Sequence, residues 1–391
     1  MKEGWSYKKL GEVCEILNGF AFQSKNYVPE GIRVIRITNV QKGYIEDTDP
    51  KYYPYETQDE LSRYLLNDGD MLLSLTGNVG RVAIIDKHYL PAYLNQRVAC
   101  IRVKNGNCLD LNYLFHLLYS KKFEEDCINS ARGAAQKNMS TVWLASYPIL
   151  VPPLSKQHSI VTRLDTAFSH IDALKADAEK QLNEARKLFQ AELTECMTPK
   201  EGWEEKRIKE VGEVIGGTTP STSNPQFWGG DVCWISPAEL HGEHYLYDSV
   251  KKITTEAVEA KSLKELPIGT VILSSRAPIG KIAINKVPMY CNQGFKCVVC
   301  KSELYNEYLY WWFYGKTEYL NSLGTGATFL EISKKVVENI IIPIPPLDIQ
   351  HSIVFHLDSL SSHIRKLEEL QQKTIAECDA LKQAMLREVF E

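Results

Sequence analysis

Polar side chains that could hydrogen bond to an extended ligand gather in loops, and loops of this kind occur twice in the chain. The apolar segment 69–74 leads into the polar loop 75–81, and the segment 269–274 leads into the loop 275–281. Arg, Lys, Ser, Thr, Asn and Gln side chains are the groups that contact phosphates and base edges in nucleic acids. The loops therefore favour recognition of a polar surface.

Catalysis would require motifs that the sequence does not contain. There is no Gly-rich cofactor loop with an acidic partner, no Walker-type Gly-Lys-Ser/Thr, no Pro-Pro-Tyr/Phe methyltransferase tetrapeptide and no His/Glu metal motif. His158 and His351 stand at the starts of two long helices without a nucleophile or acid beside them. Cys297 and Cys300 have a metal-like spacing but lack two further ligands. We expect no catalytic residue, cofactor or metal on this chain, with an enzyme of unrecognised site as an alternative.

Composition bounds the class of protein. A chain of 391 residues is long enough for two or three domains with hydrophobic cores. No apolar run approaches the roughly 18 residues of a membrane span, and the start of the chain is no signal peptide, so we expect a cytoplasmic protein without membrane contact. The net charge of −4 argues against a uniformly basic nucleic-acid binder but leaves room for a basic cleft.

An internal repeat covers the whole chain. Residues 2–5 (Lys-Glu-Gly-Trp) return as residues 200–203, and the similarity continues through Gly19 and Gly217. The first copy is residues 1–198 and the second is residues 199–391. Each copy begins with a globular α/β part of about 150 residues, which we call the first module (1–151) and the second module (199–344).

Strands and helices alternate within each module. The sequence does not fix the residue-by-residue correspondence between the expected strand at 34–38 and its repeat at 232–236. We expect strands at 34–38, 82–84 and 98–103 in the first module and at 232–236, 282–284 and 295–300 in the second. We expect helices near residues 57–66 and 111–127, and near 255–263 and 303–320.

Each module is followed by a long helical segment, 152–198 or 345–391. After a Pro-Pro-Leu start, neither segment contains Gly or Pro until its end, and apolar residues follow the 4-3 spacing of a coiled-coil seam. Subtracting 193 from the second seam gives the first. The middle of each seam is weak, because the layer near Gln181 in the first segment and the layers near Gln371 and Thr374 in the second contain polar residues. The predicted seam residues are Leu164, Ile171, Leu174, Leu188, Leu357, Leu360, Ile364, Leu367 and Leu381.

Several short phrases recur in the same order in both copies. They are Trp with Glu-Val after five to six intervening residues near each module start, Gly-Asp-Met-Leu-Leu-Ser and Gly-Thr-Val-Ile-Leu-Ser, Asn-Gln, and Ile-Pro-x-Pro-Pro-Leu-x-x-Gln before the helix. The first copy departs from the last phrase, reading Ile-Leu-Val-Pro-Pro-Leu at 149–154. This layout resembles the specificity subunit of type I restriction-modification enzymes over essentially the whole chain.

The resemblance implies an α/β (α+β) fold with two DNA target-recognition domains and two long helices forming an antiparallel coiled coil, related by a pseudo-two-fold repeat. Each domain would read one half of a split double-stranded DNA target. Two methyltransferase subunits would dock for adenine methylation, and a motor/nuclease subunit would join for restriction. S-adenosylmethionine would bind the methyltransferase, and ATP and Mg would bind the motor/nuclease. A coiled-coil adaptor with protein-binding ends is the alternative.

The repeat also sorts the polar residues. Residues identical in both copies cannot supply a difference in sequence preference, so they hold the fold or contact phosphate, whereas divergent loop residues are the candidate base readers. The identical group is Asn95, Gln96, Asn292 and Gln293. The DNA-binding candidates are Gln23, Lys25, Arg36, Thr76, Asn78, Arg81, Arg132, Gln136, Lys137, Thr219, Ser221, Arg276, Lys281, Thr325 and Thr328. Arg81 and Lys281 suit phosphate, and Arg276 suits guanine.

Overall fold

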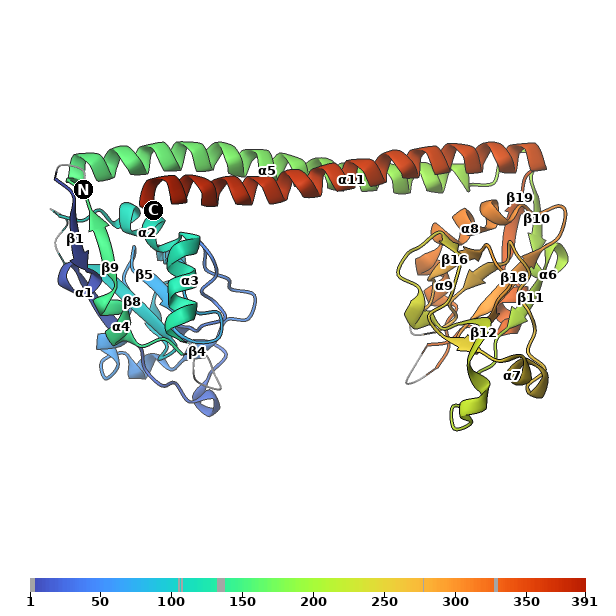
Figure 1. The fold of residues 1–391 in the computed structure, drawn as a ribbon, viewed down its shortest axis with the longest axis horizontal. Coiled ribbons are helices and arrows are strands. Elements are labelled where there is room, and N and C mark those ends of the chain that lie inside the picture. The colour runs from blue at the N-terminus through green and yellow to red at the C-terminus, as the bar shows by residue number, and fades with distance from the viewer. Residues whose placement is uncertain (1–3, 105, 107, 132–137, 277, 327–329) are drawn as a thin grey trace. The chain divides into compact units, whose positions relative to one another are not determined.

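The computed structural model describes residues 4–104, 106, 108–131, 138–276, 278–326 and 330–391. Its contacts divide the chain into two compact units (Figure 1). The first unit is Met1–Glu179 with Gln372–Glu391, and the second is Lys180–Gln371. Each unit therefore combines one module with part of each long helix, whereas the boundaries predicted from the sequence follow chain order.

The described residues of the first module form three small sheets. A four-stranded antiparallel sheet has the order β2 (Cys14–Asn18), β8 (Val98–Val103), β5 (Met71–Ser74), β6 (Val82–Ile84). A second sheet has the order β4 (Tyr52–Tyr53), β3 (Ile32–Ile35), β7 (Ala92–Leu94), in which β3 and β7 are parallel. β1 (Ser6–Lys9) pairs with β9 (Pro148–Val151). The helices are α1 (Leu10–Val13), α2 (Leu111–Leu118), α3 (Lys121–Ser130) and α4 (Thr141–Ser146).

Strand β5 is buried on both faces because the module packs two layers against it. Met71 and Leu73 belong to the cluster that includes Tyr113 and Phe123 of α2 and α3. Leu72, which points to the opposite face, belongs to the cluster formed with the three-stranded sheet. The continuous apolar run of β5 is the sequence pattern that such a doubly covered strand requires.

The second module has the same plan. One sheet has the order β11 (Gly212–Gly216), β18 (Lys296–Cys300), β15 (Val271–Leu273), β16 (Ile282–Asn285), β13 (Tyr245–Leu246). A second has the order β14 (Lys252–Ile253), β12 (Trp228–Ile235), β17 (Tyr290–Cys291). β10 (Glu204–Arg207) pairs with β19 (Ile341–Ile344). The helices are α6 (Ile208–Val211), α7 (Thr255–Ala260), α8 (Asn306–Tyr314), α9 (Thr317–Ser322) and α10 (Lys334–Glu338). The predicted mixed α/β fold is confirmed in both modules.

The structure also supplies the register that the sequence left open. The Asn95 amide donates to the Ile35 carbonyl at 3.2 Å, and the Asn292 amide donates to the Ile235 carbonyl at 3.0 Å. Ile35 therefore corresponds to Ile235, and the repeat offset at this strand is 200.

One predicted helix is wrong. Residues 57–66 form two 3-10 turns, Tyr55–Thr57 and Ser62–Tyr64, whereas the corresponding α7 is helical. The Thr57 hydroxyl donates to the Pro54 carbonyl at 2.6 Å, which competes with helical hydrogen bonding. Leu61 is buried in a cluster with Ile32 and Tyr53, so tertiary packing overrides the helical pattern.

The long helices α5 (Leu154–Cys196) and α11 (Leu347–Phe390) pair antiparallel within each unit (Figure 1). In the first unit, Arg163 contacts Glu388 at 2.8 Å and Lys175 contacts Asp379 at 2.9 Å. In the second unit, Arg186 contacts Glu368 at 2.8 Å and Glu192 contacts His356 at 2.9 Å. Residue numbers rise along α5 as they fall along α11, which confirms the predicted antiparallel coiled coil.

Most predicted seam residues are covered, and three are not. Leu164, Ile171 and Leu357 are buried, and Leu360, Ile364 and Leu367 are half-buried. The predictions for the other three are wrong, because Leu174, Leu188 and Leu381 are 59%, 62% and 51% exposed.

The next residue takes the seam position in each of these three places. Phe189 is buried beside Leu188, and Lys175 and Lys382 are half-buried beside Leu174 and Leu381. The Lys382 ammonium lies 5.1 Å from the Phe168 ring centroid. A seam can continue at i+3 or i+4, and the facing helix decides between them.

The weak middle layer is a polar contact. The Gln371 side-chain amide, which is buried, donates to Gln181 Oε1 at 2.8 Å. Both residues belong to the second unit, and this contact brings the two predicted weak layers together.

A buried glutamine fixes each long helix to its module. Gln157 Oε1 accepts from the Asp110 amide at 2.8 Å, and its Nε2 donates to the Cys108 and Pro152 carbonyls. Gln350 repeats this pattern with the Tyr305 amide at 2.8 Å and with two carbonyls. The Gln of the repeated Pro-Pro-Leu phrase is therefore structural.

A second repeated contact uses the aspartate that follows Leu164 or Leu357. The Asp165 carboxylate is 2.7 Å from His116 Nε2, and the Asp358 carboxylate accepts from Trp311 Nε1 at 2.9 Å.

Among the described residues, no helix is both long and apolar enough to cross a membrane.

Candidate nucleic-acid interface

Five loops of the second module lie side by side and form what we call the second loop cluster. They are residues 218–224, 236–240, 275–276 with 278–281, 292–294, and 325–326 with 330–332. The Ser275 amide donates to the Gly294 carbonyl at 2.8 Å, and the Ile332 amide donates to the Ser275 carbonyl at 2.9 Å. The Thr218 amide donates to the Cys291 carbonyl at 2.9 Å.

The first module brings together the corresponding loops, which form the first loop cluster: residues 20–26, 36–41, 75–81, 95–97 and 138–139. The Leu75 amide donates to the Arg97 carbonyl at 2.9 Å, and the Met139 amide donates to the Leu75 carbonyl at 2.8 Å. The Gln96 amide donates to the Phe20 carbonyl at 2.9 Å. Segments far apart in sequence thus meet in the same way in both modules.

A repeated glycine permits this approach. A Cβ added to Gly19 would lie 2.3 Å from the Asn95 carbonyl, and one added to Gly217 would lie 2.0 Å from the Asn292 carbonyl oxygen. Any larger residue would push the 95–97 or 292–294 turn away. The glycines are identical in both copies because the backbone packing requires them.

The same contact holds the loop after β5 and the loop after β15. The Ser74 hydroxyl accepts from the Arg81 amide at 2.9 Å, and the Ser274 hydroxyl accepts from the Lys281 amide at 2.8 Å. Gly80 and Gly280 have φ values of 89° and 94°, in the left-handed region. One scaffold therefore presents two different sets of side chains.

The identical Asn and Gln residues divide into two kinds. The Asn95 side chain accepts from the Arg97 amide at 3.1 Å, and that of Asn292 accepts from the Gly294 amide at 2.8 Å. These are local side-chain turns that shape the backbone. Gln96 and Gln293 are exposed, and the Gln293 amide oxygen accepts from the Thr219 hydroxyl.

The two cations predicted to contact phosphate already have partners inside their modules. Lys281 Nζ donates to the Leu240 carbonyl at 2.7 Å and to the Pro237 carbonyl at 3.1 Å. The Arg81 guanidinium donates to the Gln41 side chain. Each cation ties the 75–81 or 275–281 loop to the loop after β3 or β12, so these contacts favour a structural role.

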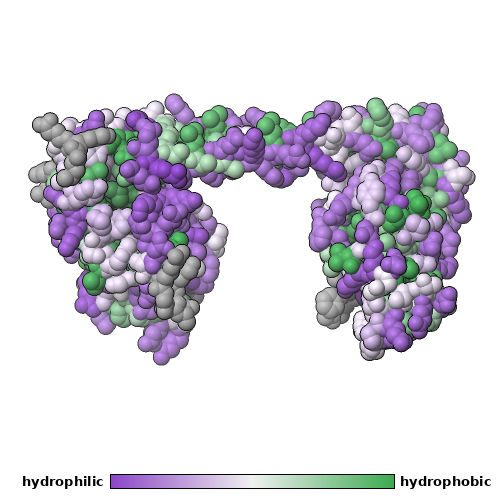
Figure 2. All heavy atoms as spheres, viewed as in Figure 1, coloured by the Kyte–Doolittle hydropathy of each residue, from purple (hydrophilic) through white to green (hydrophobic). Residues whose placement is uncertain are grey.

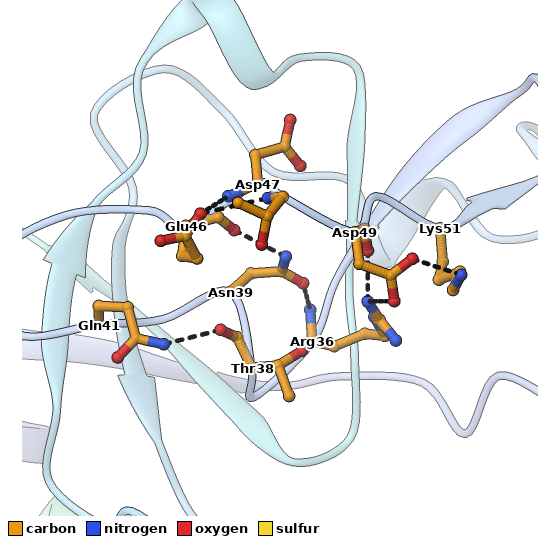
Figure 3. A network of polar contacts seen from close by, with 9 residues as sticks. Arg36, Thr38, Asn39, Gln41, Glu46, Asp47, Asp49 and Lys51 are labelled. Carbon is orange, nitrogen blue, oxygen red and sulfur yellow. Dashed lines mark hydrogen bonds and ion pairs between the residues drawn. The ribbon is translucent and has the colours of Figure 1, made fainter. Parts of the chain in front are cut away.

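Arg36 lies in a polar network on the loop that follows β3 (Figure 3). Its guanidinium donates to the Asp49 carbonyl at 2.6 Å, and its backbone amide donates to the Asn39 side chain at 2.9 Å. A hydrogen bond from Lys51 lowers the pKa of Asp49, and the Arg36 guanidinium contributes to the same shift. Glu239 accepts from the Ser236 amide in the second module, as Asn39 does from Arg36 here.

The remaining described candidates lie in the same two loop clusters. Asn78 and Thr76 lie on the 75–81 loop, and Thr325 on the second loop cluster. Gln23 and Lys25 are exposed, and the half-buried Ser221 bonds to the Ser223 hydroxyl at 2.8 Å. Four predicted residues lie outside the described part of the chain: Arg132, Gln136, Lys137 and Thr328.

In each module, the loop after β5 or β15 pairs with the turn at 95–97 or 292–294, and we call this pairing the loop junction. Each junction carries one arginine, which belongs to the turn in the first module and to the loop after the strand in the second. Thr76 and Arg97 stand where the second module has Arg276 and Gly294, because Leu75 pairs with Arg97 as Ser275 pairs with Gly294. A Cβ at Gly294 would lie 3.4 Å from Arg276 Nε, so the Arg276 side chain passes over this glycine. The exposed Arg97 guanidinium has no hydrogen-bond or ion-pair partner among the described residues.

Arg276 also belongs to a charged group of the second module. Glu331 bridges from Lys296 Nζ at 3.3 Å to the Arg276 guanidinium at 4.0 Å. Lys296 is buried and donates to the Ser275 hydroxyl at 3.1 Å and the Gln293 carbonyl at 3.2 Å.

The corresponding positions of the first module are uncharged. The strand pairs Met71 with Ile101 and Val271 with Val298 place Ala99 where Lys296 stands. The bridges Thr76 with Asn138 and Arg276 with Glu331 complete the match.

Sequence reasoning missed Arg97, Lys296 and Glu331. Arg97 directly follows the repeated Asn-Gln and faces a glycine in the other copy, so the rule of divergence could have found it. Lys296 and Glu331 gave no comparable signal, because Lys296 stands in a strand and Glu331 beyond a loop of different length. Among the described residues, the group of three potential metal ligands lies on the long helices and not in a loop cluster.

A scaffold that occurs twice and carries different polar side chains at matching places is typical of proteins that recognise two different polar targets. The chain matches the family profile described as the type I restriction modification DNA specificity domain at residues 2–184 and 200–377. It belongs to this family.

Relatives and solved structures agree with this assignment. The chain is 41% identical over 182 residues to the type I restriction enzyme MjaIX specificity subunit of Methanocaldococcus jannaschii. This match covers 45% of this chain and 42% of the relative. It is 25% identical to the putative type I restriction enzyme MjaX specificity subunit of the same organism, over 95% of this chain and 90% of the relative. A chain from a structural study of a type I R-M system has the same fold, with a TM-score of 0.78 at 22% identity over 100% of this chain and 98% of its own length.

Proposed function

We propose that the chain is the DNA-specificity subunit of a type I restriction-modification enzyme, in which each module reads one half of a split double-stranded target. The observation that carries the proposal is the repeated scaffold with divergent side chains at the loop junction. Thr76, Arg97 and Asn138 present one hydrogen-bonding pattern, and Arg276, Gly294 and Glu331 present another. Two patterns on one backbone suit two different half-sites.

The same geometry supports a chain that recognises DNA without modifying it. The polar side chains of the loop clusters are donors and acceptors fixed by strands and turns, which is how base-reading residues are held. We propose that methyl transfer to adenine and DNA cleavage belong to other subunits. S-adenosylmethionine would then bind a methyltransferase partner, and ATP and Mg a motor/nuclease partner.

Exposed leucines on the long helices support docking of two identical methyltransferase subunits. Leu188 and Leu381 are 193 residues apart, which is the repeat offset of the helices, and each is more than half exposed. Each unit thus presents the same apolar side chain at the same repeat position. Figure 2 shows hydrophobic residues among the hydrophilic ones on the visible face of these helices. Paired exposed apolar residues are what a partner that binds twice would use.

The decisive experiment reconstitutes the chain with its methyltransferase partner. Genomic DNA methylated by the complex should carry adenine methylation at one bipartite sequence, and the chain alone should neither methylate nor cleave DNA. Methyl transfer or cleavage by the chain free of other subunits would refute the division of roles. Binding to partner proteins without any sequence-specific retention of duplex DNA would favour a coiled-coil adaptor instead.

A further inference from the structure

Three side chains with metal-binding atoms converge on the long helices within the second unit. Glu192 and Cys196 are one turn apart on α5, and His356 faces them from α11. One carboxylate oxygen, the thiol sulfur and an imidazole nitrogen all lie within 4.8 Å of one another. The Glu192 carboxylate is 2.9 Å from His356 Nε2.

The backbones that carry these side chains are firmly held. Leu193 lies next to Glu192 and Leu357 next to His356, and both leucines are fully buried in the core cluster of the second unit. Cys196 packs against the same cluster. Residues i and i+4 lie on one face of a helix, so Glu192 and Cys196 point the same way. The three ligand atoms are therefore brought together by the packing of the helices rather than by mobile loops.

A carboxylate, a thiolate and an imidazole form a donor set that zinc accepts in tetrahedral sites. Tetrahedral zinc with bonds of roughly 2.0–2.3 Å needs donor atoms about 3.5 Å apart, so small rotations of the exposed His356 and the half-buried Glu192 and Cys196 side chains are enough to reach it. We propose that Glu192, Cys196 and His356 bind one Zn²⁺ ion, with water as the fourth ligand. The ion would link α5 to α11 beside the second module.

On binding, Zn²⁺ would displace the thiol proton of Cys196 and take two negative ligands, the Cys196 thiolate and the Glu192 carboxylate, so the charge of the ion would be neutralised.

The repeat provides an internal comparison. Adding or subtracting 193 places Met385, Val389 and Arg163 at the positions of Glu192, Cys196 and His356. In the first unit, Arg163 instead forms an ion pair with Glu388 at 2.8 Å. The coiled coil can therefore be closed at this level without a metal ligand set, and the three donors are a feature of the second unit alone. The proposal is independent of DNA reading.

Cobalt titration of the full-length chain tests the proposal. Co²⁺ bound by a thiolate gives a sulfur-to-metal charge-transfer band, which zinc should then remove by competition. We expect one Co²⁺ per chain, and binding weakened at least about 100-fold in Cys196→Ser and in His356→Ala. Cys378→Ser and His363→Ala, which change a cysteine and a histidine elsewhere on α11, should bind as the unmodified chain does.

Thermal unfolding gives an independent measurement. Zinc at about 100 times its dissociation constant should raise the ratio of folded to unfolded chain about 100-fold. Glu192→Gln keeps the side-chain size and a hydrogen bond to His356, so it should fold and yet lose most of this gain. The proposal is overturned if the full-length chain shows no charge-transfer band, or if Cys196→Ser or His356→Ala binds as tightly as the unmodified chain.

Discussion

Replacing the two arginines of the loop junctions should affect one half-site each. A bidentate arginine contact to guanine contributes about 1–3 kcal/mol, or roughly 5- to 150-fold in affinity. Arg97 has no internal partner among the described residues, so Arg97→Ala should lose this full amount at the half-site read by the first module. Arg276 must first leave Glu331, which is 4.0 Å away and on the surface. Such a pair costs about 0–1 kcal/mol to break, so, taking the middle of each range, Arg276→Ala should lose about 1.5 kcal/mol, or roughly 13-fold in affinity.

The assay is competition binding of the chain with its methyltransferase partner against duplexes changed one base pair at a time. Each variant should lose discrimination at one position of one half-site, and the double variant should show the product of the two effects, because separate sites act independently. Arg63→Ala, which removes an exposed arginine of the first module outside its loop cluster, is the matched control. The reasoning is refuted if either variant weakens binding equally on all sequences, which would make the arginine a phosphate contact.

Three other outcomes follow from the helices and their anchors. Replacing the polar middle residues Gln181, Gln371 and Thr374 together with leucine should raise the melting temperature in thermal unfolding and loosen the spacer preference in methylation assays. A sharp fall in the melting temperature would place these residues outside the seam. Residues 1–198 alone should form a symmetric dimer in ultracentrifugation at tens of micromolar, because a second copy supplies the missing helix. With the methyltransferase, this dimer should modify an inverted repeat of the first half-site. A monomer, or unchanged asymmetric specificity, would contradict this expectation. Burial lowers the pKa of His116 despite the Asp165 carboxylate beside it, so, as pH falls, this histidine takes up a proton in the unfolded chain before it does in the folded chain. Stability should therefore fall as pH drops from 7 to 5, and His116→Gln should reduce that slope in pH-dependent unfolding; an unchanged slope would refute it.

The lowered pKa of His116 has a structural cause. Its Nε2 is 2.7 Å from the Asp165 carboxylate, whereas its Nδ1 is buried without a hydrogen-bond partner among the described residues. A second proton would place an N–H at Nδ1 with nothing to accept it. The corresponding residue of the second module is Trp311, which makes the same contact and cannot titrate.

The sequence by itself determined the architecture. An offset near 198 for the modules and 193 for the helices, together with a 4-3 apolar spacing, predicts two α/β modules and a paired coiled coil. These features are visible because they repeat, and because secondary structure imposes a period on buried residues. The repeated Gln157 and Gln350 are also visible in the sequence, although their role as buried anchors is not.

The tertiary structure alone decided which residue of an adjacent pair enters the seam. Leu174 and Lys175 both satisfy the spacing from Ile171, and the sequence favours the leucine because it is apolar. The facing helix instead covers the stem of Lys175, whose ammonium reaches Asp379 at 2.9 Å.

The candidate reading residues were decided in the same way. Thr76, Arg97, Arg276 and Gly294 lie in loops separated by about 20 residues of sequence within each module, and only the pairing of Leu75 with Arg97 and of Ser275 with Gly294 shows that they share one junction. Lys296 lies in a predicted strand, and its burial against Glu331 depends on a third loop. Loop conformations have no sequence period of their own, so the contacts that assemble a binding surface from several loops become visible only in the folded chain.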